Sequence, residues 1–176
     1  MILLPSAYCI LSIRDGPVVN EVAPSLESFI ARLPKVELHL HLEGSIRPET
    51  LGELSKKTGL LKKGIEVWVS RRARQSYRYV DFQGFLVAFG LVTKLLESPA
   101  DYALATTRLM EWLREQNVKY AEVIFAAGVV LWKKQSVEET FETVAGAAED
   151  ARARLGVRVN WIFDAVRHFG VEHARE

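Results

Sequence analysis

Two histidines, His39 and His41, are separated by one residue in the segment 35–42, which reads K-V-E-L-H-L-H-L. Apolar and polar residues alternate strictly along this segment, which predicts a β-strand with residues 36, 38, 40 and 42 on one face and residues 37, 39 and 41 on the other. Side chains two positions apart on a strand share a face, with Cα atoms about 6.6 Å apart, so both imidazoles could reach one metal ion. An isolated H-x-H pair is also typical of a strand whose polar face is solvated. The pair therefore predicts either a two-histidine metal clamp or a polar strand face.

The segments that follow predict the elements that position the pair. Gly44 ends the strand, and Pro48 suits the first turn of a helix. Ser98 with Asp101 and Ser136 with Glu139 are typical of helix starts. The pattern predicts helices over residues 48–58, 81–97, 98–116 and 136–155, further strands over 119–126 and 157–168, and an excursion without a regular element over 60–80.

The order strand, helices, strand, helix, strand is typical of βαβ units on a parallel sheet, so the predicted class is α/β. The first loop reads E-G-S at residues 43–45, where a dinucleotide-binding fold would have G-x-G-x-x-G. A parallel (β/α) barrel of the TIM type therefore fits better. Such a barrel needs roughly 250 residues, so residues 33–176 are expected to form its first three βα units, with about five units missing. Residues 1–32 are expected to be an extension.

Composition limits the partners of the chain. The 176 residues carry a formal net charge of +1, which predicts no attraction to nucleic acid or to a membrane surface. No apolar run approaches the roughly 18 residues of a membrane helix. Cys9 is the only cysteine, so neither an internal disulfide nor a cysteine-based zinc cage can form within the chain. We expect a cytoplasmic protein that acts on a small molecule.

The longer segment 33–50, L-P-K-V-E-L-H-L-H-L-E-G-S-I-R-P-E-T, closely resembles the opening signature of the adenosine deaminase family. The resemblance continues more loosely over residues 81–89, 119–123 and 164–168. Members of this family hydrolyse the amino group from adenosine, adenine or related purines. The resemblance implies a barrel and one Zn²⁺, with His39 and His41 as two of its protein ligands. A zinc ion in such a site lowers the pKa of a water molecule, which is the chemistry that hydrolytic deamination requires.

The resemblance also implies which residues contact a purine substrate. Glu43 falls where family members place an acidic residue that, with His41, touches the sugar end. Many nucleoside deaminases have aspartate there, and relatives often carry an arginine near Ile124, so both positions indicate a divergent substrate. An apolar wall over the purine is implied for four side chains at helical spacing, although such a stripe is also typical of a helix core: Phe82, Phe85, Leu86 and Phe89.

The resemblance places the remaining zinc ligands and the catalytic residues on later strands: the general acid, an orienting histidine and an aspartate that holds the ring. None of these can be assigned in this chain, so the missing carboxyl-terminal half of the barrel is expected to be needed for a complete site. Two alternatives remain beside the purine deaminase. One is another H-x-H metal-dependent hydrolase (amidohydrolase), against which the continuation of the motif argues. The other is a truncated, non-catalytic fragment that binds a partner.

Overall fold

The computed structural model describes residues 24–57, 81–172 and 175. Residues 1–23 of the predicted extension (1–32) and the whole predicted excursion (60–80) therefore lie outside the described residues. In chain order the elements are α1 (Pro24–Arg32), β1 (Lys35–His41), η2 (Glu43–Ser45), α2 (Pro48–Lys57), α4 (Phe82–Lys94), α5 (Pro99–Glu115), β2 (Val118–Phe125), α6 (Ala127–Trp132), α7 (Val137–Leu155), β3 (Arg158–Phe163) and η4 (Arg167–Phe169), where η marks a 3-10 helix.

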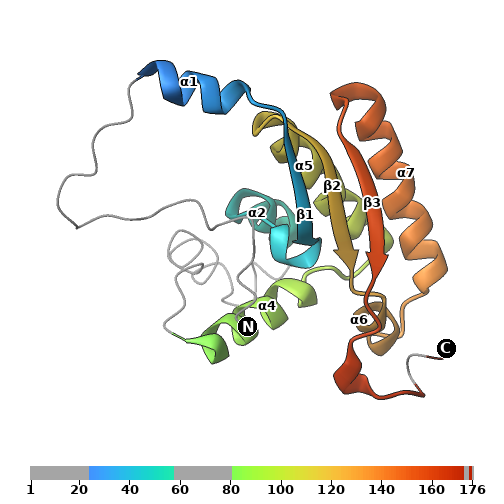
Figure 1. Cartoon of the computed structure of the whole chain (residues 1–176). Coiled ribbons are helices and arrows are strands. Elements are labelled where there is room, and N and C mark those ends of the chain that lie inside the picture. The colour runs from blue at the N-terminus through green and yellow to red at the C-terminus, as the bar shows by residue number, and fades with distance from the viewer. Residues whose placement is uncertain (1–23, 58–80, 173–174, 176) are drawn as a thin grey trace.

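The three strands form one parallel sheet in the order β1-β2-β3. Helices α5 and α7 pack against each other beside this sheet, and the short elements η2, α6 and η4 lie near the carboxyl ends of the strands (Figure 1). The predicted α/β class and the parallel strand order are confirmed. In such sheets the carboxyl ends of the strands carry the chemistry, which is where β1 delivers His41.

The core lies between the sheet and its helices. It is built from apolar side chains of β1, β2, α5 and α7, among them Leu40, Leu113, Val123 and Val144, all 3% exposed or less. Phe125 at the end of β2 contacts the rings of Tyr102, Phe141 and Phe163 at centroid distances of 5.9, 5.6 and 5.8 Å. This aromatic group fixes the ends of β2 and β3 against the helix layer.

The helix boundaries follow the local signals in the sequence. The Asp101 carboxylate accepts the backbone N–H of Ser98 at 2.8 Å, and the Ser136 hydroxyl accepts that of Glu139 at 3.1 Å. Gly156 ends α7 with φ +69°, a conformation that glycine adopts without steric cost. The predicted starts of α5 and α7 and the end of α7 are confirmed.

The third strand is shorter than predicted. It ends at Phe163 rather than near residue 168, because the next residues turn. The Asp164 carboxylate accepts the backbone N–H of Val166 at 2.8 Å, and Val166 has φ +58°, which a strand cannot continue.

Strand β1 contains a bulge that the alternating sequence did not predict. Val36 pairs with Tyr120 and Leu40 with Val123, so β1 has one more residue than β2 between these two pairs. Tyr120 and Val123 lie on opposite faces of β2, and so therefore do Val36 and Leu40. The expectation that residues 36, 38, 40 and 42 share one face is wrong on the amino-terminal side of the bulge. Bulges of this kind re-aim side chains next to functional sites.

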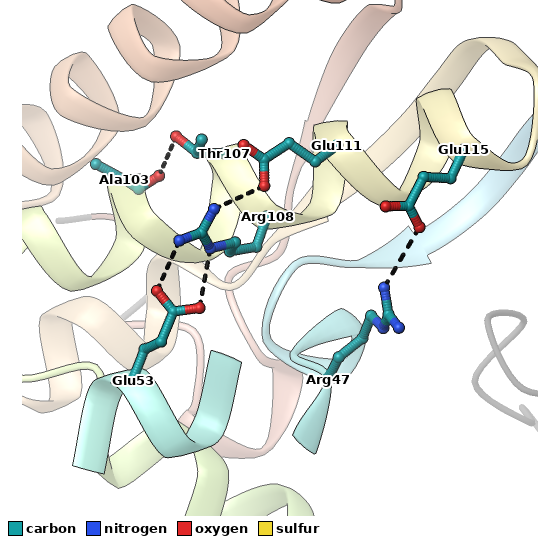
Figure 2. Close-up of polar contacts among 7 residues, drawn as sticks. All are labelled: Arg47, Glu53, Ala103, Thr107, Arg108, Glu111 and Glu115. Atoms are coloured by element: carbon teal, nitrogen blue, oxygen red, sulfur yellow. Dashed lines mark hydrogen bonds and ion pairs between the residues drawn. The ribbon is translucent and has the colours of Figure 1, made fainter. Parts of the chain in front are cut away.

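Helix α2, which follows the first loop, is tied to α5 by an ion-pair network (Figure 2). The Arg108 guanidinium binds both carboxylate oxygens of Glu53, at 3.0 and 2.7 Å, and Glu111 at 2.8 Å. These carboxylates hold the pKa of Arg108 above its usual range. Side chains of Arg108 and Glu53 are 39% and 40% exposed, so solvent screens the pair and it contributes only about 1 kcal/mol or less.

Within the described ranges, no helix is long and apolar enough to cross a membrane.

Candidate active site

The imidazoles of His39 and His41 lie side by side at the carboxyl end of β1. Their ring centres are 5.4 Å apart and the rings are tilted by 56°. Zinc lies about 2 Å from a ligating nitrogen and hence about 3 Å from the ring centre, so two imidazoles on one tetrahedral zinc have ring centres about 5 Å apart. The observed separation fits two ligands of a single metal ion.

The surroundings of His41 favour the neutral imidazole that metal binding requires. Burial lowers the pKa of His41, and the neighbouring His39 lowers it further, whereas Asp164 raises it. His39 is exposed, while His41 is only half-buried. Among the described residues, the pair is therefore open to solvent.

The two histidines do not form a complete metal site by themselves. In the part of the chain that the structure describes, no group of three or more histidine, cysteine, aspartate or glutamate side chains could hold a metal ion. A catalytic zinc commonly has three protein ligands, with a fourth position left for water or substrate. Any further ligand must therefore come from outside these residues.

An aromatic row on α4 leads to the histidine pair. Phe82, Phe85 and Phe89 follow one another with ring centres 5.9 Å apart at each step. A Cβ placed on Gly44 would lie 3.6 Å from the Phe89 ring and 3.4 Å from the Cβ of His41, so Phe89 and His41 flank Gly44 from two sides. Leu86 is 45% exposed and Phe82 60% exposed. In the predicted apolar wall, Phe82 is therefore open to solvent, whereas Phe89 lies close to Gly44 and His41.

Glu43 is only 1% exposed. One carboxylate oxygen, Oε1, accepts the backbone N–H of Ala126 at 3.1 Å, immediately after β2. Burial raises the pKa of Glu43 to about 7, and Asp164 raises it while the Ala126 hydrogen bond and Lys133 lower it. The pKa of Tyr102 is raised by burial and by the nearby Glu43 and Asp101 carboxylates. The expected contact between Glu43 and a substrate sugar stays a prediction.

The sequence did not single out two charged residues near this site. Asp164 follows β3, and its charge acts on both His41 and Glu43. The available signal was the family resemblance over residues 164–168, which begins at Asp164, whereas the predicted strand ran past this residue to 168. Lys133 follows α6, and its ammonium group donates to the carbonyl oxygens of Thr93 and Leu96 and lies 5.7 Å from the centre of the Tyr102 ring. No local pattern could have indicated that contact, because it joins residues 31 to 40 positions apart.

Comparison with known proteins decides the family. The sequence pattern described as adenosine deaminase matches residues 34–176, which include the histidine pair, Glu43 and the row on α4. The chain belongs to the adenosine deaminase family. The resemblance seen in the segment 33–50 is thereby confirmed.

Relatives of known name support membership of the adenosine deaminase family. An adenosine deaminase of Clostridium perfringens (strain SM101 / Type A) is 33% identical over 148 residues, which cover 84% of this chain and 45% of that protein. The chain thus spans about half the length of the curated relatives that it matches.

Solved structures show the same fold. An adenine deaminase from Arthrobacter aurescens is similar with a TM-score of 0.63 at 26% identity, over 74% of this chain and 39% of that one. An amidohydrolase from Burkhoderia ambifaria, solved with bound Zn, gives a TM-score of 0.69 at 24% identity, over 83% and 39%. The prediction that this chain carries the first part of an α/β barrel is confirmed.

Proposed function

We propose that the complete gene product containing these residues is a zinc-dependent hydrolase that removes the exocyclic amino group of an adenine ring, either free or attached to ribose. In this reaction water adds to the ring carbon that bears the amino group, the carbon–nitrogen bond breaks, and ammonia leaves. The observation that carries the proposal is the pair of imidazoles with ring centres 5.4 Å apart, beside Gly44, which the ring of Phe89 also approaches.

Each part of the described site has a role in this proposal. His39 and His41 would hold the zinc ion, which when bound supplies the activation of water. The aromatic row on α4 would cover the flat purine, and Leu86 would extend it toward solvent. An apolar cover excludes water from the reacting group and strengthens the electrostatic interactions around it. His41, which shares the side of His39, would also lie nearest to the sugar end of a nucleoside.

Family members named adenosine deaminase and adenine deaminase are both similar to this chain. Adenosine and adenine have the adenine ring in common, so the proposed substrate class is defined by this ring and not by the sugar. The ligands and proton-transferring groups that complete the reaction would be supplied by residues beyond those described.

The test uses the complete gene product and the variants His39→Ala and His41→Ala. Zinc content is measured by elemental analysis, and deamination by the loss of adenosine and adenine absorbance. Each variant should lose tight zinc binding and at least about a hundred-fold in turnover, since even outer partners of a metal ligand contribute roughly ten- to a hundred-fold. A chelator should abolish wild-type turnover and added zinc should restore it. Full zinc occupancy with wild-type turnover in either variant would contradict the proposal.

A further inference from the structure

The carboxyl end of α4 is held by two side chains from the segment after α6. The Lys133 ammonium donates to the carbonyl oxygen of Thr93, at 3.0 Å, and to that of Leu96. The Gln135 amide donates to the carbonyl oxygens of Leu96 and Glu97, at 3.3 and 2.7 Å. The last carbonyls of a helix have no partner within the helix, so donors from elsewhere stabilise that end. Lys133 reaches into α4 itself, because Thr93 lies within the helix.

The positive charge of Lys133 is favourable at this position. The carboxyl end of a helix is the negative end of its dipole, and hydrogen bonds from a charged donor are stronger than those from a neutral one. The Lys133 side chain is half-buried. Burial lowers the pKa of Lys133, whereas the nearby carboxylates of Glu97, Asp101 and Glu43 raise it. A neutral, apolar side chain of similar length would lose both bonds to α4.

The two ends of α4 differ in how closely they are packed. Near the carboxyl end, Val92 is 7% and Thr93 8% exposed. Near the amino end, Phe82 is 60% and Val87 63% exposed among the described residues. The direction of the helix therefore depends mainly on the contacts that hold its carboxyl end.

The segment that carries Lys133 is itself fixed to the ends of the strands. At the start of α6, the Gly128 N–H donates to the carbonyl oxygen of Asp164 at 3.0 Å, directly after β3. Val130, within α6, is fully buried. The bonds of Lys133 thus connect α4 to the end of the sheet at which β1 delivers His41.

We propose that Lys133 is a positioning residue whose bonds to the carboxyl end of α4 hold the aromatic row over the purine. This inference rests on the proposed deaminase function, and it gives Lys133 no contact with the substrate. The row approaches the site at Phe89, whose ring lies 3.6 Å from a Cβ placed on Gly44, beside His41. Phe89 lies about one helical turn before Thr93, whose carbonyl oxygen Lys133 binds.

Substitutions in the complete gene product test this role. Lys133→Met removes the charge and the donor but keeps a long, unbranched side chain. Lys133→Arg keeps the charge and N–H donors, so it should preserve the position of α4. Lys134→Met is the matched control, because it removes the same charge one position later, where the side chain is exposed. If Lys133→Met does not fold, Lys133→Gln takes its place, since glutamine is neutral and one atom shorter than lysine.

The measurements are kcat and KM for adenosine and for adenine, the zinc dissociation constant by competition with a chromogenic chelator, and hydrogen exchange of the backbone. Lys133→Met should raise KM for both purines roughly two- to ten-fold, because it misplaces an aromatic contact that contributes about that much. Its kcat and zinc affinity should stay within about two-fold of the wild type, since the proposed zinc ligands lie on β1.

Hydrogen exchange reports on α4 without any substrate. In Lys133→Met the amides of α4 should exchange roughly three- to ten-fold faster, while those of α7 stay unchanged, because a lost hydrogen bond lowers the free energy of local opening. Lys133→Arg and Lys134→Met should stay within about two-fold of the wild type in every measurement.

A double variant shows whether Lys133 acts through the row. If it does, Lys133→Met combined with Phe89→Ala should have a KM within about two-fold of that of Phe89→Ala alone. Effects on KM that multiply would overturn the proposal, and so would an unchanged KM or unchanged exchange of α4 in folded Lys133→Met. Failure of the proposed function is a separate result: the wild type would deaminate neither purine, while hydrogen exchange would still report whether Lys133 holds α4.

Discussion

At the scale of single residues, Phe89 connects the aromatic row to the proposed metal pair. Its ring and the Cβ of His41 flank Gly44, at 3.6 and 3.4 Å from a Cβ placed there. Phe82 lies seven positions earlier on α4, which is about 10 Å along the helix axis. If the row covers a purine, the contribution of each ring should therefore fall from Phe89 through Phe85 to Phe82.

This gradient can be measured with alanine substitutions in the complete gene product. Phe89→Ala should raise KM for adenine and adenosine roughly two- to ten-fold, because an aromatic contact contributes about 0.5–1.5 kcal/mol beyond its buried area. Phe85→Ala should have a smaller effect, and Phe82→Ala, at a position 60% exposed, the smallest. Thermal unfolding of each variant serves as the control for folding. Equal effects at the three positions would show that the row is packing rather than a substrate surface.

Single residues also show which features of the site could be predicted from the sequence and which could not. The spacing of His39 and His41 predicted that both rings lie on one side of β1, and the structure places them side by side. The burial of Glu43 could not be predicted, because Ala126 and Tyr102, which enclose it, are 83 and 59 positions away. A sequence motif identifies residue types that are neighbours along the chain, whereas the burial of a side chain depends on distant segments that pack against it.

At the scale of elements, the close approach between α6 and the segment after β3 depends on Gly128. A Cβ at this position would lie 2.2 Å from the carbonyl oxygen of Ala165, a backbone atom that cannot rotate away. The Gly128 N–H donates to the carbonyl oxygen of Asp164 at 3.0 Å, and the Asp164 N–H donates to that of Phe125 at 3.0 Å. The carboxyl ends of β2 and β3 are thus joined through a position that only glycine fits.

Gly128→Ala should therefore lower the free energy of unfolding by about 1–3 kcal/mol, the usual cost of overpacking, and should weaken zinc binding because Asp164 lies near His41. Gly146→Ala in α7 is the matched control, since nothing lies within 4 Å of a Cβ placed on Gly146. That substitution should stabilise the protein by about 0.5–1 kcal/mol, because alanine favours a helix interior over glycine. Urea unfolding of both variants tests the difference. A Gly128→Ala variant as stable as the wild type would show that this approach is not tight in solution.

The sequence predicted those elements that carry their own boundary signals. The starts of α5 and α7 depend on contacts three residues apart, at Ser98 and Ser136, so local patterns identify them. Helix α6 has six residues and no side-chain cap, and the tertiary contact at Gly128 determines its place. The bulge in β1 is set by its register with β2, which alternation within one strand does not reveal.

At the scale of the whole molecule, the described sheet has two unpaired edges. Strands β1 and β3 each pair only with β2 among the residues of the described sheet. Apolar side chains on both edge strands are open to solvent: Val36 is 62%, Leu38 56% and Phe163 53% exposed. A second apolar surface lies on α1, where Phe29 is 53% and Ile30 47% exposed. Exposed strand edges pair readily with other chains, and large apolar surfaces favour association.

Residues 1–176 expressed alone should therefore self-associate, bind zinc weakly through two histidines only, and show no deamination. Size-exclusion chromatography with light scattering measures the mass against the 19.9 kDa of one chain. Lysine on an edge strand blocks pairing, so the double variant Val36→Lys, Leu38→Lys should shift the protein toward the monomer. The double variant Phe29→Lys, Ile30→Lys adds the same charge to α1 and should leave the association in place. If instead the α1 variant is the monomeric one, the helix face and not the strand edge drives association. A wild-type chain of 19.9 kDa that deaminates adenosine would contradict both the edge argument and the need for residues beyond those described.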